Sequence, residues 1–191
     1  MNPVILASER VSLTDPERRM ILETADAFVY EAGRSTLVLA LRGSRNKKLE
    51  KFHAEPLPGF GIYRGMPEAD VLARIDQLIH EDLLLIASSR DGFPLLGFTP
   101  RGLELVEGWT AEKWLEELRE QVDDPMPLQL TFAYDRLPNR NLKTLHLLLD
   151  ALEIEVDLSW LPLLETWCGI EVGRVRTRLF LLIERLESRV F

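Results

Sequence analysis

A short run of basic residues interrupts an otherwise acidic sequence. It reads LALRGSRNKKL over residues 39–49 and follows a stretch of apolar helix-forming residues that stops at Gly43. If Ser44 opens a helix, the free backbone N–H groups of its first turn and the positive end of the helix dipole make a phosphate site. Five cationic side chains can surround that site: Arg42, Arg45, Lys47, Lys48 and Lys51.

The charge balance reverses around this run. The 191 residues include 23 Lys and Arg against 31 Asp and Glu, a formal net charge of −8. The segment from Arg34 to Met66, however, contains seven basic residues and only two acidic ones, Glu50 and Glu55. An acidic total argues against a protein coated in nucleic acid but is compatible with a local basic face. The alternative is a solvated basic segment that balances an acidic chain, and charge alone favours it.

The elements around the basic run have the form of a helix-turn-helix. Residues 15–33 predict a helix capped by Asp15 and ended by Gly33. Residues 35–43 predict a short second helix, and Ser44 is placed to cap a third. Short helices joined by a tight glycine turn are typical of this motif.

A longer helix and a hairpin follow. The spacing of apolar residues predicts an amphipathic helix from Glu68 to about Asp82. LLLIAS and PLLGFT predict two strands joined by a turn at Asp91-Gly92, and Thr99 is placed to cap a helix over residues 101–108. Helices followed by a two-stranded hairpin make a winged helix-turn-helix arrangement.

We therefore predict an α+β protein with two domains, residues 1–107 and 108–191. The first is the winged helix-turn-helix, and the second is a small, mainly helical or α/β domain. Its elements are predicted as helices over residues 110–122, 141–153 and 172–186 and strands over LQLTFAYD (128–135) and IEVDLSW (154–160).

Composition and motifs argue against several classes of site. With one cysteine, Cys168, and three His, we expect no disulfide framework, metal or other cofactor. No apolar run approaches the roughly 20 residues that cross a bilayer, and the N-terminus lacks the basic region of a secretory signal, so we expect a cytoplasmic protein with no membrane partner. Neither a P-loop nor a nucleophile elbow is present, and the glycines of PLPGFGIYRG do not fit a dinucleotide fingerprint. The acidic run over residues 153–157 is explained by the exposed face of a strand, so we predict no catalytic residues.

Four short motifs occur in a fixed order within residues 16–107: Arg42-Gly43-Ser44, Phe60-Gly61-Ile62-Tyr63-Arg64, Gln77-Leu78-Ile79 and Phe98-Thr99-Pro100-Arg101-Gly102. Together they resemble the RQC domain, the winged-helix module at the C-terminal side of RecQ-family DNA helicases. The resemblance covers about half of the chain. The P-loop and the zinc-binding cysteines that usually precede this domain are absent, so we expect an RQC module that works without a helicase motor.

The resemblance implies specific contacts to DNA. The residues that it assigns to the duplex backbone are Arg42, Ser44, Asn46 and Arg64. In some relatives an aromatic residue of the wing stacks on the terminal base pair. Phe93 lies near that position, with Arg90 beside it to reach a phosphate. The alternative for Phe93 is burial beneath the hairpin.

The longer helix is predicted to stay out of the major groove. Its exposed positions are Glu68, Asp70, Arg74, Asp76, His80 and Glu81. Four of these six are carboxylates, which phosphates repel.

Two functions remain open. The first is a non-enzymatic protein that binds double-stranded or junction DNA, mainly through phosphates at the Arg-Gly-Ser turn and the wing. The second is a winged-helix scaffold that docks a DNA-processing protein through residues 108–191. The acidic charge favours the scaffold, and the clustered basic residues favour DNA.

Overall fold

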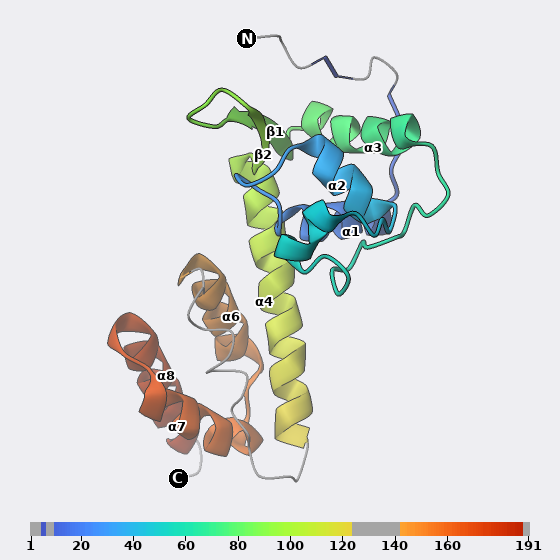
Figure 1. Cartoon of the computed structure of the whole chain (residues 1–191). Coiled ribbons are helices and arrows are strands. Elements are labelled where there is room, and N and C mark those ends of the chain that lie inside the picture. Colours follow the sequence, from blue (N-terminus) through green and yellow to red (C-terminus); the bar gives the residue numbers. More distant parts are fainter. Residues whose placement is uncertain (1–4, 7–9, 124–141, 189–191) are drawn as a thin grey trace. The chain divides into compact units, whose positions relative to one another are not determined.

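The computed structural model describes residues 5–6, 10–123 and 142–188. The chain divides into two compact units, Met1–Val106 and Glu107–Phe191. Figure 1 shows the chain coloured from its first residue to its last, with helices and strands labelled.

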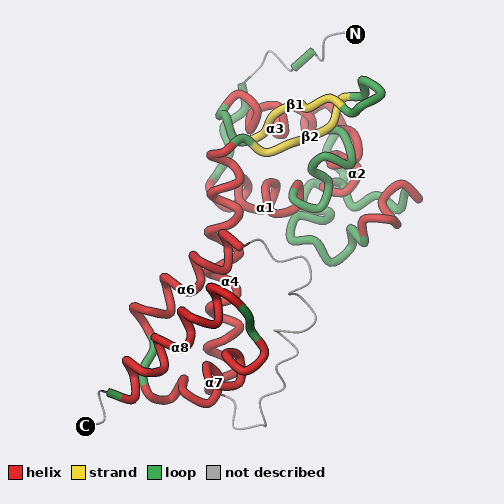
Figure 2. Tube along the Cα trace, turned by 90° about the vertical axis from the view of Figure 1, so that its left-hand side faces the viewer, coloured by secondary structure: helices red, strands yellow, loops and turns green. Residues whose placement is uncertain are grey.

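The first unit combines helices with one small sheet. The two strands pair antiparallel, from Leu84 opposite Phe98 to Ser88 opposite Pro94, and form a hairpin (Figure 2). This mixture agrees with the predicted α+β class. In chain order the elements are α1 (Asp15–Ala25), α2 (Arg34–Leu41), the 3-10 helix η1 (Lys47–Phe52), α3 (Glu68–His80), β1 (Leu84–Ser88) and β2 (Pro94–Phe98).

The first helix differs from its prediction at both ends. Thr14 rather than Asp15 caps α1, through a capping box in which Thr14 and Glu17 each accept a backbone N–H of the other. The helix stops at Ala25 instead of Gly33. The chain after it bonds to β2 instead: the N–H of Leu96 donates to the carbonyl oxygen of residue 32 at 2.8 Å.

An apolar core fills the space between these helices and the hairpin. The face predicted for the longer helix is buried at Val71, Ile75 and Leu78. Burying a large apolar side chain contributes about 1.5–3 kcal/mol, so these residues hold α3 firmly in the unit. The fully buried large side chains of the unit are Phe28, Ile21, Leu22, Leu37, Leu41, Ile75, Leu78, Leu83, Leu84 and Leu96.

One carboxylate of α3 lies in this core. Asp76 was expected to be exposed, and that prediction is wrong: its side chain is 0% exposed and forms an ion pair with Arg34 at the start of α2. Arg34 also donates to the carbonyl oxygen of Ile5 at 3.2 Å. The guanidinium of Arg34 offsets part of the cost of burying this carboxyl group, and the pair ties α2 to α3.

The second strand leads directly into a long helix, α4 (Pro100–Asp123). Thr99 caps it as predicted, with its Oγ1 accepting the N–H of Gly102 at 3.1 Å. A Cβ on Gly102 would lie 1.9 Å from the carbonyl oxygen of Leu83, so only glycine fits there. The predicted break at Gly108 is wrong, because α4 continues through it. A glycine in a helix costs about 1 kcal/mol relative to alanine, which a helix of 24 residues tolerates.

The described part of the second unit is helical. Besides the end of α4 it contains α6 (Leu142–Glu155), the 3-10 helix η3 (Leu158–Trp160), α7 (Leu161–Ile170) and α8 (Gly173–Glu187). The helices predicted over residues 141–153 and 172–186 correspond to α6 and α8, whereas α7 was not predicted. LQLTFAYD lies outside the described residues.

The strand predicted over IEVDLSW is wrong. Its first two residues end α6, and its last three form η3. The burial of Leu145, Leu149, Leu152 and Val156 follows helical spacing, which extends the helical face into this segment. The acidic run is likewise structural: Arg178 pairs with Glu153, and Arg119 pairs with Glu155.

The buried ion pair predicts a measurable difference between two arginines. Arg34→Met leaves the Asp76 carboxylate buried without this partner and should lower the free energy of unfolding by about 3 kcal/mol. Arg19→Met is the matched control: Arg19 lies 40% exposed beside Glu23, and its loss should cost less than about 1 kcal/mol. Urea denaturation of both variants measures the difference, and equal losses would contradict the role given to Asp76.

Candidate nucleic-acid interface

The basic run begins where α2 stops. Gly43 takes a left-handed conformation with φ of +66°, which lets the chain reverse. Its N–H donates to the carbonyl oxygen of Ala40 at 2.8 Å, and the N–H of Ser44 donates to that of Leu39 at 2.9 Å. These two bonds are a glycine helix stop, so the predicted end of the helix is confirmed.

The loop that contains Phe60-Gly61-Ile62-Tyr63-Arg64 packs against this helix end. The N–H of Gly61 donates to the carbonyl oxygen of Ala40 at 3.0 Å, and the N–H of Tyr63 donates to that of Leu41 at 2.9 Å. A helix leaves its last carbonyl groups unpaired, and here the loop pairs two of them. Two motifs far apart in the sequence therefore form one structure.

Arg64 is brought onto the turn by this packing. A Cβ built on Gly43 would lie 3.2 Å from Nη2 of Arg64 and 3.0 Å from the Cα of Gly61. The Arg64 side chain thus lies across the turn, while the residue remains exposed. We call residues 42–48 together with Arg64 the basic turn.

Ser44 does not open a helix. The cap of η1 is Asn46, whose Oδ1 accepts the N–H of Lys48 at 3.0 Å, and the Ser44 Oγ accepts the N–H of Asn46 at 3.2 Å. The prediction was wrong by two residues because both side chains are good caps, and the glycine stop leaves residues 44–46 outside any helix. Because only a six-residue 3-10 helix follows the turn, the positive potential there comes mainly from side chains.

The cations of the run divide into two groups. Arg45, Lys47, Lys48 and Arg64 are exposed and form no ion pair within the described residues. The other two are engaged. Arg42 donates from Nε to the carbonyl oxygen of Met66 at 3.0 Å, and Lys51 lies 3.7 Å from Glu31 and 4.2 Å from the centre of the Phe52 ring.

The wing presents a second pair of candidates. In the loop between the strands, Ser89 and Phe93 exchange hydrogen bonds: Ser89 N–H to the Phe93 carbonyl oxygen and Phe93 N–H to the Ser89 Oγ, both at 2.9 Å. The Phe93 side chain is 66% exposed, so the alternative of burial beneath the hairpin is wrong. Arg90 is exposed as well.

The wing and the basic turn lie at opposite ends of α2. At the first end, a Cβ on Gly33 would lie 2.8 Å from the carbonyl oxygen of Pro94 in β2. At the second end, Gly43 starts the turn. Eight helical residues separate them, about 12 Å at 1.5 Å per residue. The structure therefore brings Arg64 to the Arg-Gly-Ser turn but keeps Arg90 and Phe93 apart from it.

Two carboxylates of the first unit, Glu81 and Glu17, are engaged in hydrogen bonds within it. Glu81 accepts from Arg18 at 2.8 Å, which holds the pKa of that carboxyl below its usual range. Glu17 accepts from the Tyr63 hydroxyl at 3.1 Å, and burial raises the pKa of Tyr63 to about 12. Tyr63 is therefore neutral at physiological pH and anchors the loop that carries Arg64.

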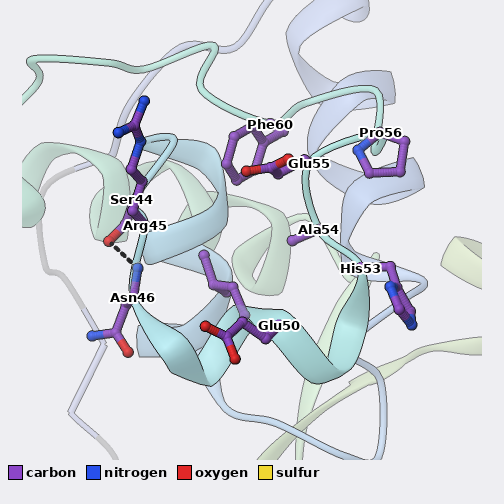
Figure 3. A pocket seen from close by; sticks show the side chains of 10 residues that line it. Ser44, Arg45, Asn46, Glu50, His53, Ala54, Glu55, Pro56 and Phe60 are labelled. Carbon is purple, nitrogen blue, oxygen red and sulfur yellow. Dashed lines mark hydrogen bonds between the residues drawn. The ribbon is translucent and has the colours of Figure 1, made fainter.

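A cavity of about 520 Å³ lies beside the basic turn. Figure 3 shows Ser44 and Arg45 on one side of it, Glu50 on η1, and the segment from Ala54 to Phe60 closing it from the other side. The sequence did not predict this site; the one signal was an aromatic residue in a loop otherwise rich in Gly and Pro. The lining residues are Ser44, Arg45, Asn46, Leu49, Glu50, His53, Ala54, Glu55, Pro56 and Phe60.

Two other kinds of site, a metal site and a membrane span, are absent from the described residues. Their His, Cys, Asp and Glu side chains form no group that could hold a metal ion. None of their helices is both long and apolar enough to cross a membrane.

Comparison with known families finds a match to this chain. The family model of the RQC domain matches residues 15–119, more than half of the chain. The chain belongs to the RQC domain family. No curated protein and no solved structure gave a significant match. The RQC domain is a winged helix associated with DNA binding and is not itself catalytic.

The glycine stop predicts a difference between two substitutions. Gly43→Ala combines a positive φ with a Cβ that crowds Gly61 and Arg64, and it should cost about 2–3 kcal/mol of stability. Gly65→Ala is the control, because φ there is +84° but nothing lies within 4 Å of the added Cβ. It should cost only the backbone strain, about 1 kcal/mol. Thermal or urea unfolding compares the two, and equal costs would show that the turn and the loop are not packed together.

Proposed function

We propose that this protein binds duplex or junction DNA without catalysing a reaction, mainly through phosphate contacts from the basic turn and the wing. The observation that carries the proposal is the group of four exposed cations on the basic turn, Arg45, Lys47, Lys48 and Arg64, none in an ion pair within the described residues. Exposed cations of this kind suit contact with phosphates. Such contacts fix the position of the protein on the duplex without reading its bases. Ser44, Asn46, Arg42 and Lys51 would complete this surface, and the protein would act in the cytoplasm.

Binding should depend on the cations of the turn. Fluorescence anisotropy with blunt, forked and single-stranded DNA at several salt concentrations should show affinity that falls steeply with salt. The triple variant R45A/K47A/K48A should lose at least tenfold in affinity, and the slope of log K against log salt should become shallower by about 2–3, because three phosphate contacts are lost.

A matched control removes the same charge elsewhere. Lys113, Arg174 and Arg176 are exposed residues of the second unit, outside the basic turn and the wing, and K113A/R174A/R176A should retain the salt slope. If the wild-type protein binds no DNA even at low salt, the proposed function is wrong. If both triple variants lose affinity equally, net charge rather than the basic turn is responsible.

The wing should contribute to structure preference. Phe93 lies in the loop between the strands with its side chain exposed, which would let it stack on a terminal base pair. Phe93→Ala should lower affinity for forked or blunt-ended DNA by about 1–3 kcal/mol and leave affinity for a closed hairpin duplex nearly unchanged. Competition binding between these DNAs measures the change, and an equal loss on both would contradict stacking at an end.

The second unit supports a further candidate, the docking of a DNA-processing protein. Phe180 and Leu181 on α8 are 54% and 57% exposed, which is more apolar surface than a helix facing only water usually carries. Residues 108–191 also hold 10 basic against 15 acidic residues, so a basic partner is favoured. Substituting Phe180 and Leu181 by Ser should abolish such an interaction in a pull-down with a purified candidate partner and leave DNA binding unchanged.

A further inference from the structure

The cavity beside the basic turn has walls suited to a flat, uncharged group. Leu49 and Ala54 contribute apolar surface and are 5% and 3% exposed, and Phe60 adds a partly buried aromatic ring. A volume of about 520 Å³ lies within the range of small-molecule sites. The cavity therefore has room for a nucleobase with its sugar.

The side of the cavity formed by Glu50 and Glu55 is unfavourable for a phosphate. Glu50 and Glu55 line it, and both residues are exposed and form no side-chain bond within the described residues. Two carboxylates beside one cavity repel a phosphate but accept hydrogen bonds from N–H groups. The occupant that fits carries N–H donors and no negative charge.

The opposite side of the same cavity belongs to the basic turn. Ser44 and Arg45 line it there (Figure 3). A phosphate held by Arg45 would thus have the cavity next to it. In a nucleic acid, the group that is covalently attached beside each phosphate is a sugar that carries a base.

We propose that this cavity receives one unpaired nucleobase of the bound DNA and favours a base with an exocyclic amino group. The inference rests on the proposed function, because the basic turn must first hold the adjoining phosphate. At the 4-position cytosine offers an amino group to a carboxylate, whereas uracil has a carbonyl oxygen there and only its N3–H to donate. The Phe60 ring provides a surface for stacking.

The test uses duplexes that differ at one bulged position: deoxycytidine, deoxyuridine or an abasic site. Deoxycytidine and deoxyuridine have nearly the same shape but differ in hydrogen-bond pattern at N3 and the 4-position, so their comparison tests which donors the carboxylates favour. By fluorescence anisotropy at fixed salt, the full-length protein should bind the deoxycytidine bulge about tenfold more tightly than the abasic one. The deoxyuridine bulge should gain no more than about threefold.

Two variants test the assignment of residues. E50Q/E55Q should remove the preference for deoxycytidine over deoxyuridine, and E165Q/E187Q, which neutralises two exposed carboxylates of the second unit, should keep it. The ratio of the two affinities is the readout, because neutralising any carboxylate also raises affinity for DNA in general. Phe60→Leu keeps an apolar side chain but removes the ring, and it should reduce the advantage of either base over the abasic site.

The outcomes separate this inference from the proposed function. Equal affinity of the wild-type protein for all three bulges, with DNA binding intact, would overturn the base cavity alone. A preference for deoxyuridine, or a preference for deoxycytidine that survives in E50Q/E55Q, would overturn the role given to the carboxylates. Absence of binding to every DNA at low salt would instead overturn the proposed function.

Discussion

The end of α2 is the constraint on which the candidate interface depends. Its last carbonyl groups need hydrogen-bond donors, and they receive them from two places: the glycine stop that follows directly and the loop around Gly61 and Tyr63. Satisfying these groups fixes the path of both segments. Arg64 reaches the basic turn because the backbone of its loop is tied to the helix end.

Several carboxylates of the first unit are engaged by partners within it. Asp76 is buried against Arg34, Glu81 binds Arg18, and Glu17 holds the hydroxyl of Tyr63. These interactions support the first unit, while Glu50 and Glu55 stay exposed beside the cavity at the turn. What matters for association with a polyanion is this local distribution, because exposed charges separated by more than about 8–10 Å are largely screened at physiological salt.

Much of the first unit could be predicted because its signals are local. The glycine stop at Gly43, the cap at Thr99 and the apolar face of α3 each depend on residues a few positions apart. The errors came from long-range contacts: Asp76 is buried because Arg34 reaches it, and α1 ends early because the following residues bond to β2. The helical form of IEVDLSW was missed since a short apolar segment fits both periodicities.

The candidate site was predictable to a similar degree. The basic residues were visible as a cluster, and the motif match placed Arg64 beside them. The cavity was not, because it arises only when η1 and the loop ending at Phe60 fold around the turn. Nor could the sequence decide between Ser44 and Asn46 as the helix cap, since both side chains suit that position.

The exposed state of Arg45, Lys47 and Lys48 has a consequence for how this domain can evolve. None of the three contributes an ion pair to the described fold, whereas a Cβ on Gly43 would crowd the Cα of Gly61 at 3.0 Å. Electrostatic attraction can therefore rise or fall by single substitutions with little effect on folding. Selection for DNA affinity and selection for stability therefore act on neighbouring but separate positions. The positive charge of the basic turn can change by substitution, whereas its backbone conformation is constrained.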